Sequence, residues 1–301
     1  MHSKLYPLLS FLLFVTFIIG CKNKTTNSQE SKNIVEKITN QIKEVPEEKA
    51  PEIHYSIIKK ADWIAKKDSL EAGKHLDIVA ALNRTDQQHL NRLDSIIVPD
   101  RYDLTLDDYM PFPKNVEALK DVKKIIIFSN AVQAFGAYEN GKLVLQGQSN
   151  MGKKSTPTPA NLYFCNWKAK RSVSTVNSKW ILNWNFNISN FGGIGFHEYA
   201  LPGYPASHSC MRLLASDAKF LYDWAEQWVL DGNKEIAKGT PVIITGEYPY
   251  GSARPWYNLA NEPNSLNYNE ASMKDIIAPH LDKILQKQQQ RLDYLGKKEA
   301  A

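Results

Sequence analysis

The fold is decided by one stretch of the sequence, Gly195-Phe196-His197-Glu198 followed by Leu201-Pro202-Gly203-Tyr204-Pro205-Ala206-Ser207-His208-Ser209-Cys210-Met211-Arg212-Leu213. The chain has seven histidines, and the two in its β-rich part both fall in this stretch, close to Cys210. Histidines scattered through a hydrophobic core would not be expected to gather around one cysteine. We therefore take this stretch as the candidate active site.

A cysteine with nearby histidines is a residue set typical of nucleophilic catalysis. An imidazole that accepts the thiol proton raises the thiolate fraction and can later return that proton. The imidazole needs a partner that orients it, and a turn that ends at a cysteine offers backbone N–H groups to a developing oxyanion. Alone, Cys210 would be interpreted as a small core residue, but His197 and His208 favour catalysis.

Residues 122–247 have the alternation and turn signals of a mainly β domain with one or two helices. Asn140-Gly141 predicts a type I′ hairpin turn. Ser216 is expected to cap a helix over 217–230 that places Trp224 and Trp228 on one face. The expected strands are 125–128, 131–138, 142–148, 162–164, 180–186 and 242–245.

The motifs of this region resemble those of the YkuD-type L,D-transpeptidase catalytic domain. Besides His197 and the segment Ser207–Arg212, the resemblance includes the hairpin at 138–142, the loop at 155–159 and Gly239-Thr240-Pro241-Val242. It covers about residues 122–247. It implies a mainly β catalytic domain of sandwich-like or barrel-like form.

The resemblance also implies roles for individual residues. Cys210 matches the acylated nucleophile, and His197 matches the general base, oriented by the backbone carbonyl of Glu198. His208 matches a second histidine beside the thiol, and the N–H groups of Ser209 and Cys210 match an oxyanion hole. Arg212 matches a position near the substrate carboxylates, and Ser207 and Tyr204 are the other expected substrate-binding residues. Wall residues of the acyl cleft are a second interpretation of Trp180, Trp184, Tyr199 and Tyr204, for each of which core or rim packing is the simpler one.

Two positions depart from the family pattern. The family most often has glycine where this chain has Ser209 and Glu198. If the backbone at Ser209 adopts a positive φ, serine is strained there by roughly 1–2 kcal/mol. Glu198 is expected to narrow the cleft or to alter the choice of acceptor. Both departures leave the pairing of Cys210 with His197 intact.

The implied reaction is acyl transfer on peptidoglycan stem tetrapeptides, without a cofactor. An amine acceptor would give 3→3 cross-links, protein attachment or D-amino-acid exchange, and water would make the protein an L,D-carboxypeptidase. One alternative is a catalytically silent, wall-binding lipoprotein. Another is zinc bound by His197, His208 and Cys210, but the His-x-Cys spacing is cramped and no matching carboxylate is evident. We expect no metal.

The N-terminus indicates export and lipidation. Residues 1–20 have the basic start and apolar run of a signal peptide, too short for a typical membrane-spanning helix. Ile18-Ile19-Gly20-Cys21 resembles a bacterial lipobox, in which Cys21 would carry the lipid. The resemblance implies a membrane anchor and a periplasm-facing location, and Lys22 favours the outer membrane. Polar residues 21–51 are expected to form a flexible tether.

The segments on either side of the β domain are expected to be mainly helical. Residues 52–121 form a helical region and connector, with Ile57 and Ile58 at helical spacing and a short strand that Pro99 ends. Part of this region loosely resembles a LysM glycan-binding module, but a plain helical spacer is the simpler interpretation. Residues 248–301 are a C-terminal extension with a helix over 272–296, in which Pro279 is a candidate break.

Composition excludes several classes. The 301 residues are 43% hydrophobic and 23% charged, which is ordinary for a globular protein. A net charge of +5 is too mild to indicate nucleic-acid binding. Three cysteines are too few for a disulfide framework. Only the N-terminal run is apolar enough to concern a membrane, so a polytopic membrane protein is excluded.

Overall fold

A five-stranded sheet organises the centre of the structure. The computed structural model describes residues 52–66 and 72–299, which belong to one compact unit. The sheet order is β5-β4-β3-β13-β6, with bounds β3 Ile125–Ser129, β4 Ala134–Glu139, β5 Lys142–Gln148, β6 Asn161–Phe164 and β13 Pro241–Thr245. Asn140 and Gly141 have φ of 48° and 77°, which confirms the predicted hairpin turn.

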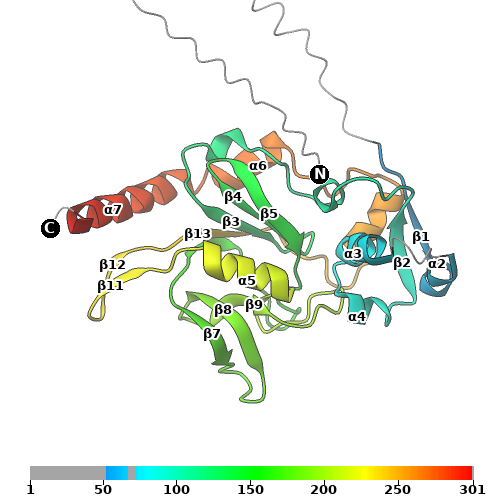
Figure 1. Cartoon of the computed structure of the whole chain (residues 1–301), viewed down its shortest axis with the longest axis horizontal. Helices are drawn as coiled ribbons and strands as arrows, with labels where there is room; N and C mark the ends of the chain where they lie inside the picture. The colour runs from blue at the N-terminus through cyan, green and yellow to red at the C-terminus, as the bar shows by residue number, and fades with distance from the viewer. Residues whose placement is uncertain (1–51, 67–71, 300–301) are drawn as a thin grey trace, which may run out of the picture. The chain divides into compact units, whose positions relative to one another are not determined.

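A second sheet packs against the first and carries the candidate catalytic residues (Figure 1). Its order is β10-β9-β8-β7, with bounds β7 Lys168–Val173, β8 Ile181–Ser189, β9 Ile194–Glu198 and β10 Met211–Leu213. Aromatic rings fill the space between the sheets. Phe128 of β3 lies 5.9 Å from Phe196 of β9, which lies 5.3 Å from Phe186 of β8, between ring centroids. The predicted mainly β fold is confirmed.

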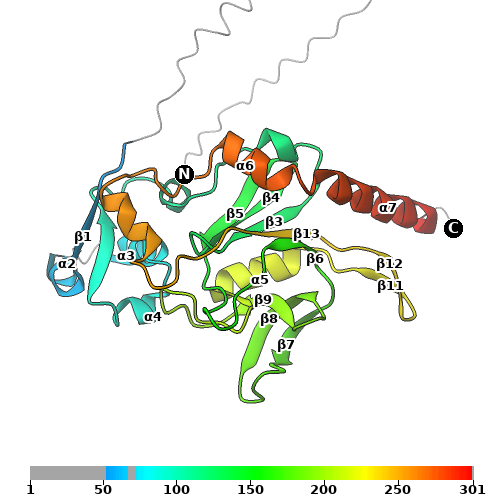
Figure 2. The same cartoon turned by 180° about the vertical axis from the view of Figure 1, so that it is seen from behind.

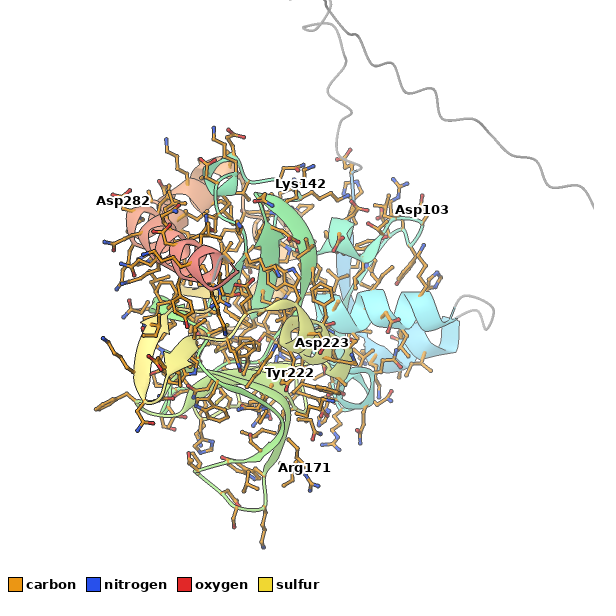
Figure 3. The ribbon with its side chains drawn as sticks, turned by 60° about the vertical axis from the view of Figure 1, so that its left-hand side comes forward. Asp103, Lys142, Arg171, Tyr222, Asp223 and Asp282 are labelled. Carbon is orange, nitrogen blue, oxygen red and sulfur yellow. The ribbon has the colours of Figure 1, made fainter. Side chains whose placement is uncertain are left out.

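Helix α5, Ala215–Trp224, completes this core. Its buried Ala218 and Leu221 pack in the same hydrophobic cluster as the rings above. Figure 3 shows the helix, marked by Tyr222 and Asp223, between the level of Lys142 in β5 and that of Arg171 in β7.

The predicted helix over 217–230 was wrong in its extent. Leu214 rather than Ser216 is the N-cap, and the chain leaves the helix at Ala225, whose ψ is 149°. Trp228 therefore does not share a helix face with Trp224. Instead, the chain continues into a two-stranded hairpin of β11, Val229–Asp231, and β12, Lys234–Ala237.

The N-terminal part of the unit is a two-stranded sheet with three helices, where helices and one short strand were predicted. Its elements are β1 Tyr55–Lys59, α2 Lys60–Lys66, α3 Ala72–Leu82, α4 Gln87–Leu90 and β2 Ser95–Pro99. The predicted strand that ends at Pro99 is confirmed as β2, but a second strand, β1, replaces the start of the predicted helix. Ile57 and Ile58 are in a strand because they pair with Ile97 and Ile96 of β2, and β-branched residues suit such a ladder. Glycan binding by this region stays a prediction.

This N-terminal part is bonded to the loop that leads to Cys210. The N–H of Leu201 donates to Asp86 Oδ2 at 2.8 Å, and the Leu201 carbonyl accepts from the hydroxyl of Thr85 at 2.7 Å. The buried Arg84 donates through Nε to the carbonyl of Val132 at 2.7 Å. The region is therefore a packed support for the β domain rather than a spacer.

Helix α6, Glu270–Ile277, and the start of α7, Leu281–Glu299, pack on the five-stranded sheet, while the rest of α7 extends beyond it (Figure 2). Pro279 lies at the break between the two helices. Met273, Ile277 and Ile284 pack in one cluster with Ile125 and Ile243 of the sheet. The remaining short helices are η1 Leu106–Tyr109, η2 Glu117–Leu119 and η3 Pro255–Ala260. Among the described residues, no helix combines the length and apolar character needed to cross a membrane.

Candidate active site

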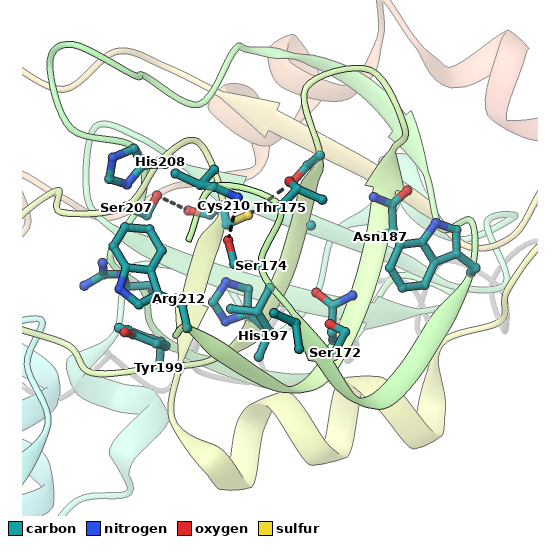
Figure 4. Close-up of a pocket in the computed structure, with 18 residues that line it drawn as sticks. Ser172, Ser174, Thr175, Asn187, His197, Tyr199, Ser207, His208, Cys210 and Arg212 are labelled. Atoms are coloured by element: carbon teal, nitrogen blue, oxygen red, sulfur yellow. Dashed lines mark hydrogen bonds between the residues drawn. The ribbon is translucent and has the colours of Figure 1, made fainter. Parts of the chain in front are cut away.

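One face of the second sheet is the floor of a pocket (Figure 4). β9 and β10 run parallel, with His197 opposite Arg212 and Phe196 opposite Met211. Since side chains alternate along a strand, Phe196 and Met211 enter the core while His197 and Arg212 face the pocket. Cys210, directly before β10, lines the same pocket. The structure thus brings the predicted nucleophile and base together.

His197 is held in one tautomer. Its Nδ1 lies 2.9 Å from the backbone carbonyl of Glu198, which can only accept, so Nδ1 carries the proton and Nε2 is free to accept one. The ring is buried, with 4% of the residue exposed. Burial lowers the pKa of His197 to about 4, and the positive charge of Arg212 acts in the same direction. The resting ring is therefore neutral at physiological pH.

The Cys210 thiol is also neutral at rest. Burial raises its pKa, while the N–H of Gly195 and the charge of Arg212 act in the opposite direction. The thiol donates to the carbonyl of Gly193, with an Sγ–O distance of 3.4 Å. In the described part of the chain it makes no hydrogen bond to His197. The pair is thus a thiol beside an imidazole, and proton transfer has to accompany attack on a substrate.

Ser209 has the backbone conformation for which glycine is better suited. Its φ is 72°, and its hydroxyl donates to the carbonyl of Thr156 at 3.3 Å. Among the described residues, the backbone N–H groups of Ser209 and Cys210 have no protein acceptor. Successive unpaired N–H groups near a left-handed residue form an anion-binding concavity. The two amides beside the thiol are therefore available to an oxyanion.

Arg212 supplies positive charge without a carboxylate partner among the described residues. Its guanidinium donates to the carbonyls of Ala200 and Ala206 at 3.3 and 3.0 Å. The guanidinium carbon lies 4.7 Å from the centroid of the Tyr199 ring. Arg212 therefore holds both ends of the loop before Cys210 while its charge remains in the pocket.

His208 is paired with a lysine that the motif analysis missed. Its Nε2 lies 3.1 Å from Lys153 Nζ. An ammonium can only donate, so Nε2 accepts and the proton is on Nδ1, which is buried without a partner. Burial lowers the pKa of His208, and the charges of Lys153 and Arg212 lower it further. Its ring lies 5.1 Å from that of Trp180, between centroids.

Several predicted residues lie elsewhere or act through the backbone. Ser207 is buried and its hydroxyl donates to the carbonyl of Cys210. The Glu198 carboxylate accepts from Asn183 at 2.6 Å, and Tyr204 is half exposed. Glu198, Tyr204 and Trp184 do not line the pocket, so the expectation that Glu198 narrows the cleft was wrong. Cys21 lies outside the described residues.

Polar pocket residues on β7 and β8 were also missed. The pocket is lined by Ser172, Asn185 and Asn187. Because side chains alternate along a regular strand and Leu182 faces the pocket, the sequence would place Trp184 rather than Asn185 on the pocket face. Lys153 lies in the loop between β5 and Ser155-Thr156-Pro157, and its local sequence gives no signal of its contact with His208. Within the described residues, no three His, Cys, Asp or Glu side chains are placed to hold a metal ion.

Comparisons with known proteins identify the domain. Residues 123–244 match the model of the YkuD family, described as the L,D-transpeptidase catalytic domain. No curated protein sequence matched the chain.

Solved structures similar to the chain include three L,D-transpeptidases. The one from Stackebrandtia nassauensis is 21% identical over 54% of this chain and 67% of its own, with a TM-score of 0.35. One from Mycobacterium tuberculosis is 20% identical over 51% of this chain and 72% of its own, with a TM-score of 0.33. One from Mycobacterium smegmatis is 16% identical over 41% of this chain and 59% of its own, with a TM-score of 0.33. This chain thus spans about three fifths to seven tenths of their lengths. By the family match, residues 123–244 belong to the YkuD L,D-transpeptidase catalytic domains.

Proposed function

We propose that the protein is a peptidoglycan L,D-transpeptidase that forms an acyl-enzyme on Cys210. The observation that carries the proposal is the tautomer of His197, whose proton-free Nε2 belongs to the pocket that Cys210 lines. The family match of residues 123–244 supports it. The positive charge of Arg212, which has no carboxylate partner in the described part of the chain, suits a substrate that carries carboxylates.

The reaction begins when the thiol proton of Cys210 passes to His197 Nε2. The sulfur attacks the carbonyl that joins the L-centre of a stem-peptide diaminopimelate or lysine to the terminal D-residue. The N–H groups of Ser209 and Cys210 stabilise the oxyanion. The C–N bond then breaks, His197 returns the proton to the leaving amine, and a thioester remains. An acceptor amine attacks that thioester, loses its proton to His197 and restores the thiol.

The acceptor determines the product. A second stem peptide gives a 3→3 cross-link, a protein lysine gives an attachment, and a free D-amino acid gives exchange. Water gives hydrolysis, and the protein would then be an L,D-carboxypeptidase. The neutral resting pair is compatible with each, since every acceptor needs the same base.

A second candidate is a catalytically silent, wall-binding protein. The observation that favours it is the positive φ of Ser209, 72°, which strains a residue whose N–H belongs to the proposed oxyanion hole. Acyl-enzyme formation distinguishes the two candidates because a silent protein would bind the peptide without losing its thiol.

We also propose that Cys21 carries a lipid. The protein would then face the periplasm from a membrane, with the outer membrane favoured by Lys22, and its partners would be peptidoglycan stem peptides. Metabolic labelling with an alkyne fatty acid, with Cys21→Ser as control, tests the anchor. Label that persists in the variant would contradict it.

The test of function uses the chain from residue 22 onward with muropeptides that carry tetrapeptide stems, followed by mass spectrometry. We expect loss of the terminal D-alanine together with dimers, and no loss in Cys210→Ala. Cys165→Ala is the matched control because Cys165 is buried in the core. Loss without dimers would indicate the carboxypeptidase. Turnover that persists in Cys210→Ala would contradict the mechanism.

A further inference from the structure

β8 contains a bulge that changes which side chains face the pocket. In a regular strand, residues 182, 184 and 186 would share one face. Instead Leu182 lines the pocket while Phe186 is buried in the core, because the pairing with β9 shifts between Asn183 and Phe186. Trp184 has φ 52°, a conformation that is strained for a bulky residue. A strained bulge beside a pocket commonly re-aims a side chain.

The re-aimed side chain is Asn185. It is 5% exposed, it lines the pocket, and among the described residues no group hydrogen-bonds its side-chain amide. Asn187, two residues on, differs: its amide donates to the carbonyl of Ser189 at 3.2 Å and accepts from Asn166 at 3.1 Å. Asn187 is thus bonded within the protein and has a structural role. The amide of Asn185 lines the pocket with no partner among the described residues, so it is available to a ligand.

A second unpaired group lies on the neighbouring strand. The Ser172 hydroxyl is buried and has no hydrogen-bond partner within residues 52–66 and 72–299, and Ser172 lines the same pocket. Ser172 is opposite Leu182 in the pairing of β7 with β8, and Figure 4 shows it on the pocket side together with His197 and Asn187. On adjacent strands the pocket therefore has a carboxamide and a buried hydroxyl that have no hydrogen-bond partner among the described residues.

The charges of the pocket indicate what this pair would bind. Arg212, on β10, gives the pocket a positive charge, and no aspartate or glutamate of the described residues lines the pocket. A carboxylate is therefore drawn toward Arg212, while an uncharged carboxamide and hydroxyl suit a neutral group. A carboxamide presents a donor and an acceptor, which match the C=O and N–H of a peptide bond.

We propose that Asn185 and Ser172 form a subsite that binds a backbone amide of the acyl-donor peptide, positioned by the Trp184 bulge. The inference rests on the proposed function, since the donor is taken to be a stem peptide. Asn185 is then a specificity-determining residue that recognises the peptide chain, while Arg212 recognises its carboxylates.

The test measures tetrapeptide binding to the full chain in detergent by calorimetry, in a Cys210→Ala background that prevents turnover. We expect Asn185→Leu, which keeps the shape and removes the hydrogen bonds, to weaken binding by roughly tenfold or more. Ser172→Ala is expected to have a smaller effect in the same direction. Asn183→Leu is the matched control, because Asn183 lies on the same strand and bonds Glu198 outside the pocket.

Peptides in which one amide at a time is replaced by an ester identify the contact. The ester at the amide that Asn185 contacts should weaken peptide binding to the parent chain. The same ester should not weaken peptide binding to Asn185→Leu, which has already lost that contact. In chains that retain Cys210, the rate of thiol alkylation by iodoacetamide should be unchanged by Asn185→Leu, which excludes a general disturbance of the site. Asn185→Ser serves in the same assays if Asn185→Leu does not fold.

Equal binding by the parent and both Asn185 variants would overturn the subsite and leave the proposed function in place. If the parent does not bind the tetrapeptide and the unaltered chain releases no D-alanine from it, the proposed function fails, and the subsite fails with it.

Discussion

Replacement of Asp217 by asparagine should stabilise the protein in a pH-dependent way. The free energy of unfolding of the variant, minus that of the unaltered chain, should be larger at neutral pH than at acid pH. Asp217 is on α5 and is 9% exposed. One carboxylate oxygen accepts from the Ser216 hydroxyl at 3.0 Å, and the other is buried without a partner among the residues that the structure describes. Burial raises the pKa of Asp217 from 3.8 to about 6, although the Ser216 hydrogen bond acts against it.

The magnitude follows from linkage between protonation and folding. A pKa raised in the folded state means that the fold prefers the protonated acid, so stability is full below pH 3.8 and declines as pH rises to about 6. The difference between these two pKa values corresponds to about 3 kcal/mol. Asparagine cannot ionise, so Asp217→Asn should escape this decline. A fixed packing difference between the two side chains does not depend on pH.

Urea unfolding at several pH values between 3 and 8 measures the effect. The free energy of unfolding of Asp217→Asn, minus that of the unaltered chain, should increase by about 3 kcal/mol across this range. Asp223→Asn is the control, since Asp223 is on the same helix and its pKa is lowered by the hydrogen bond to Lys219. A difference for Asp217→Asn that stays constant with pH would refute the reasoning.

Three further predictions concern the pocket. Ser209→Gly should raise the free energy of unfolding by roughly 1 kcal/mol, measured by urea unfolding, because glycine relieves the positive φ. The variant should not slow acyl-enzyme formation, measured by mass spectrometry. A variant less stable than the unaltered chain would count against strain at Ser209. Iodoacetamide should modify Cys210 more slowly at pH 7 than it modifies a free cysteine, with a rate that still rises above pH 9, because burial raises the thiol pKa; a rate independent of pH between 5 and 9 would instead indicate an ion pair with His197. Lys153→Met should raise the pKa of His208, measured by NMR titration, because the lysine charge contributes to lowering it. The exposed neighbour Lys154 supplies the control variant Lys154→Met, and an unchanged His208 pKa in Lys153→Met would show that the contact at 3.1 Å is not populated.

Local sequence signals predicted the strands of the larger sheet well. Asn140-Gly141 favours the positive φ values that a two-residue hairpin turn needs. An apolar run such as Ile125–Phe128 is stable only when it is buried in a core. The strand β7, by contrast, was missed because Lys168–Val173 is mostly polar and faces a pocket rather than the core. The end of α5 at Trp224 was missed because the apolar spacing continues to Trp228.

The candidate site could be predicted only where its residues are close in sequence or carry the chemistry themselves. Cys210 and His197 were identified in this way, and the carbonyl of Glu198 accepts from His197 as expected. Asn185 and Lys153 could not be identified because their positions depend on tertiary structure. A positive φ at a tryptophan has no signal in the sequence, and the contact of Lys153 with His208 joins residues far apart in the chain.

The hydrogen bonds of Thr85 and Asp86 to Leu201 have a consequence for where a fragment with an intact pocket can begin. A fragment cut at residue 122 would contain the whole family domain. It would nevertheless remove the acceptor of the Leu201 N–H and the donor to its carbonyl, on the segment that precedes Cys210. The side chains of Gln148 and Asn150 would also lose the backbone carbonyls of Thr85 and Arg84. The smallest fragment that keeps the pocket intact is therefore expected to be larger than the family domain, and truncations should begin near residue 52.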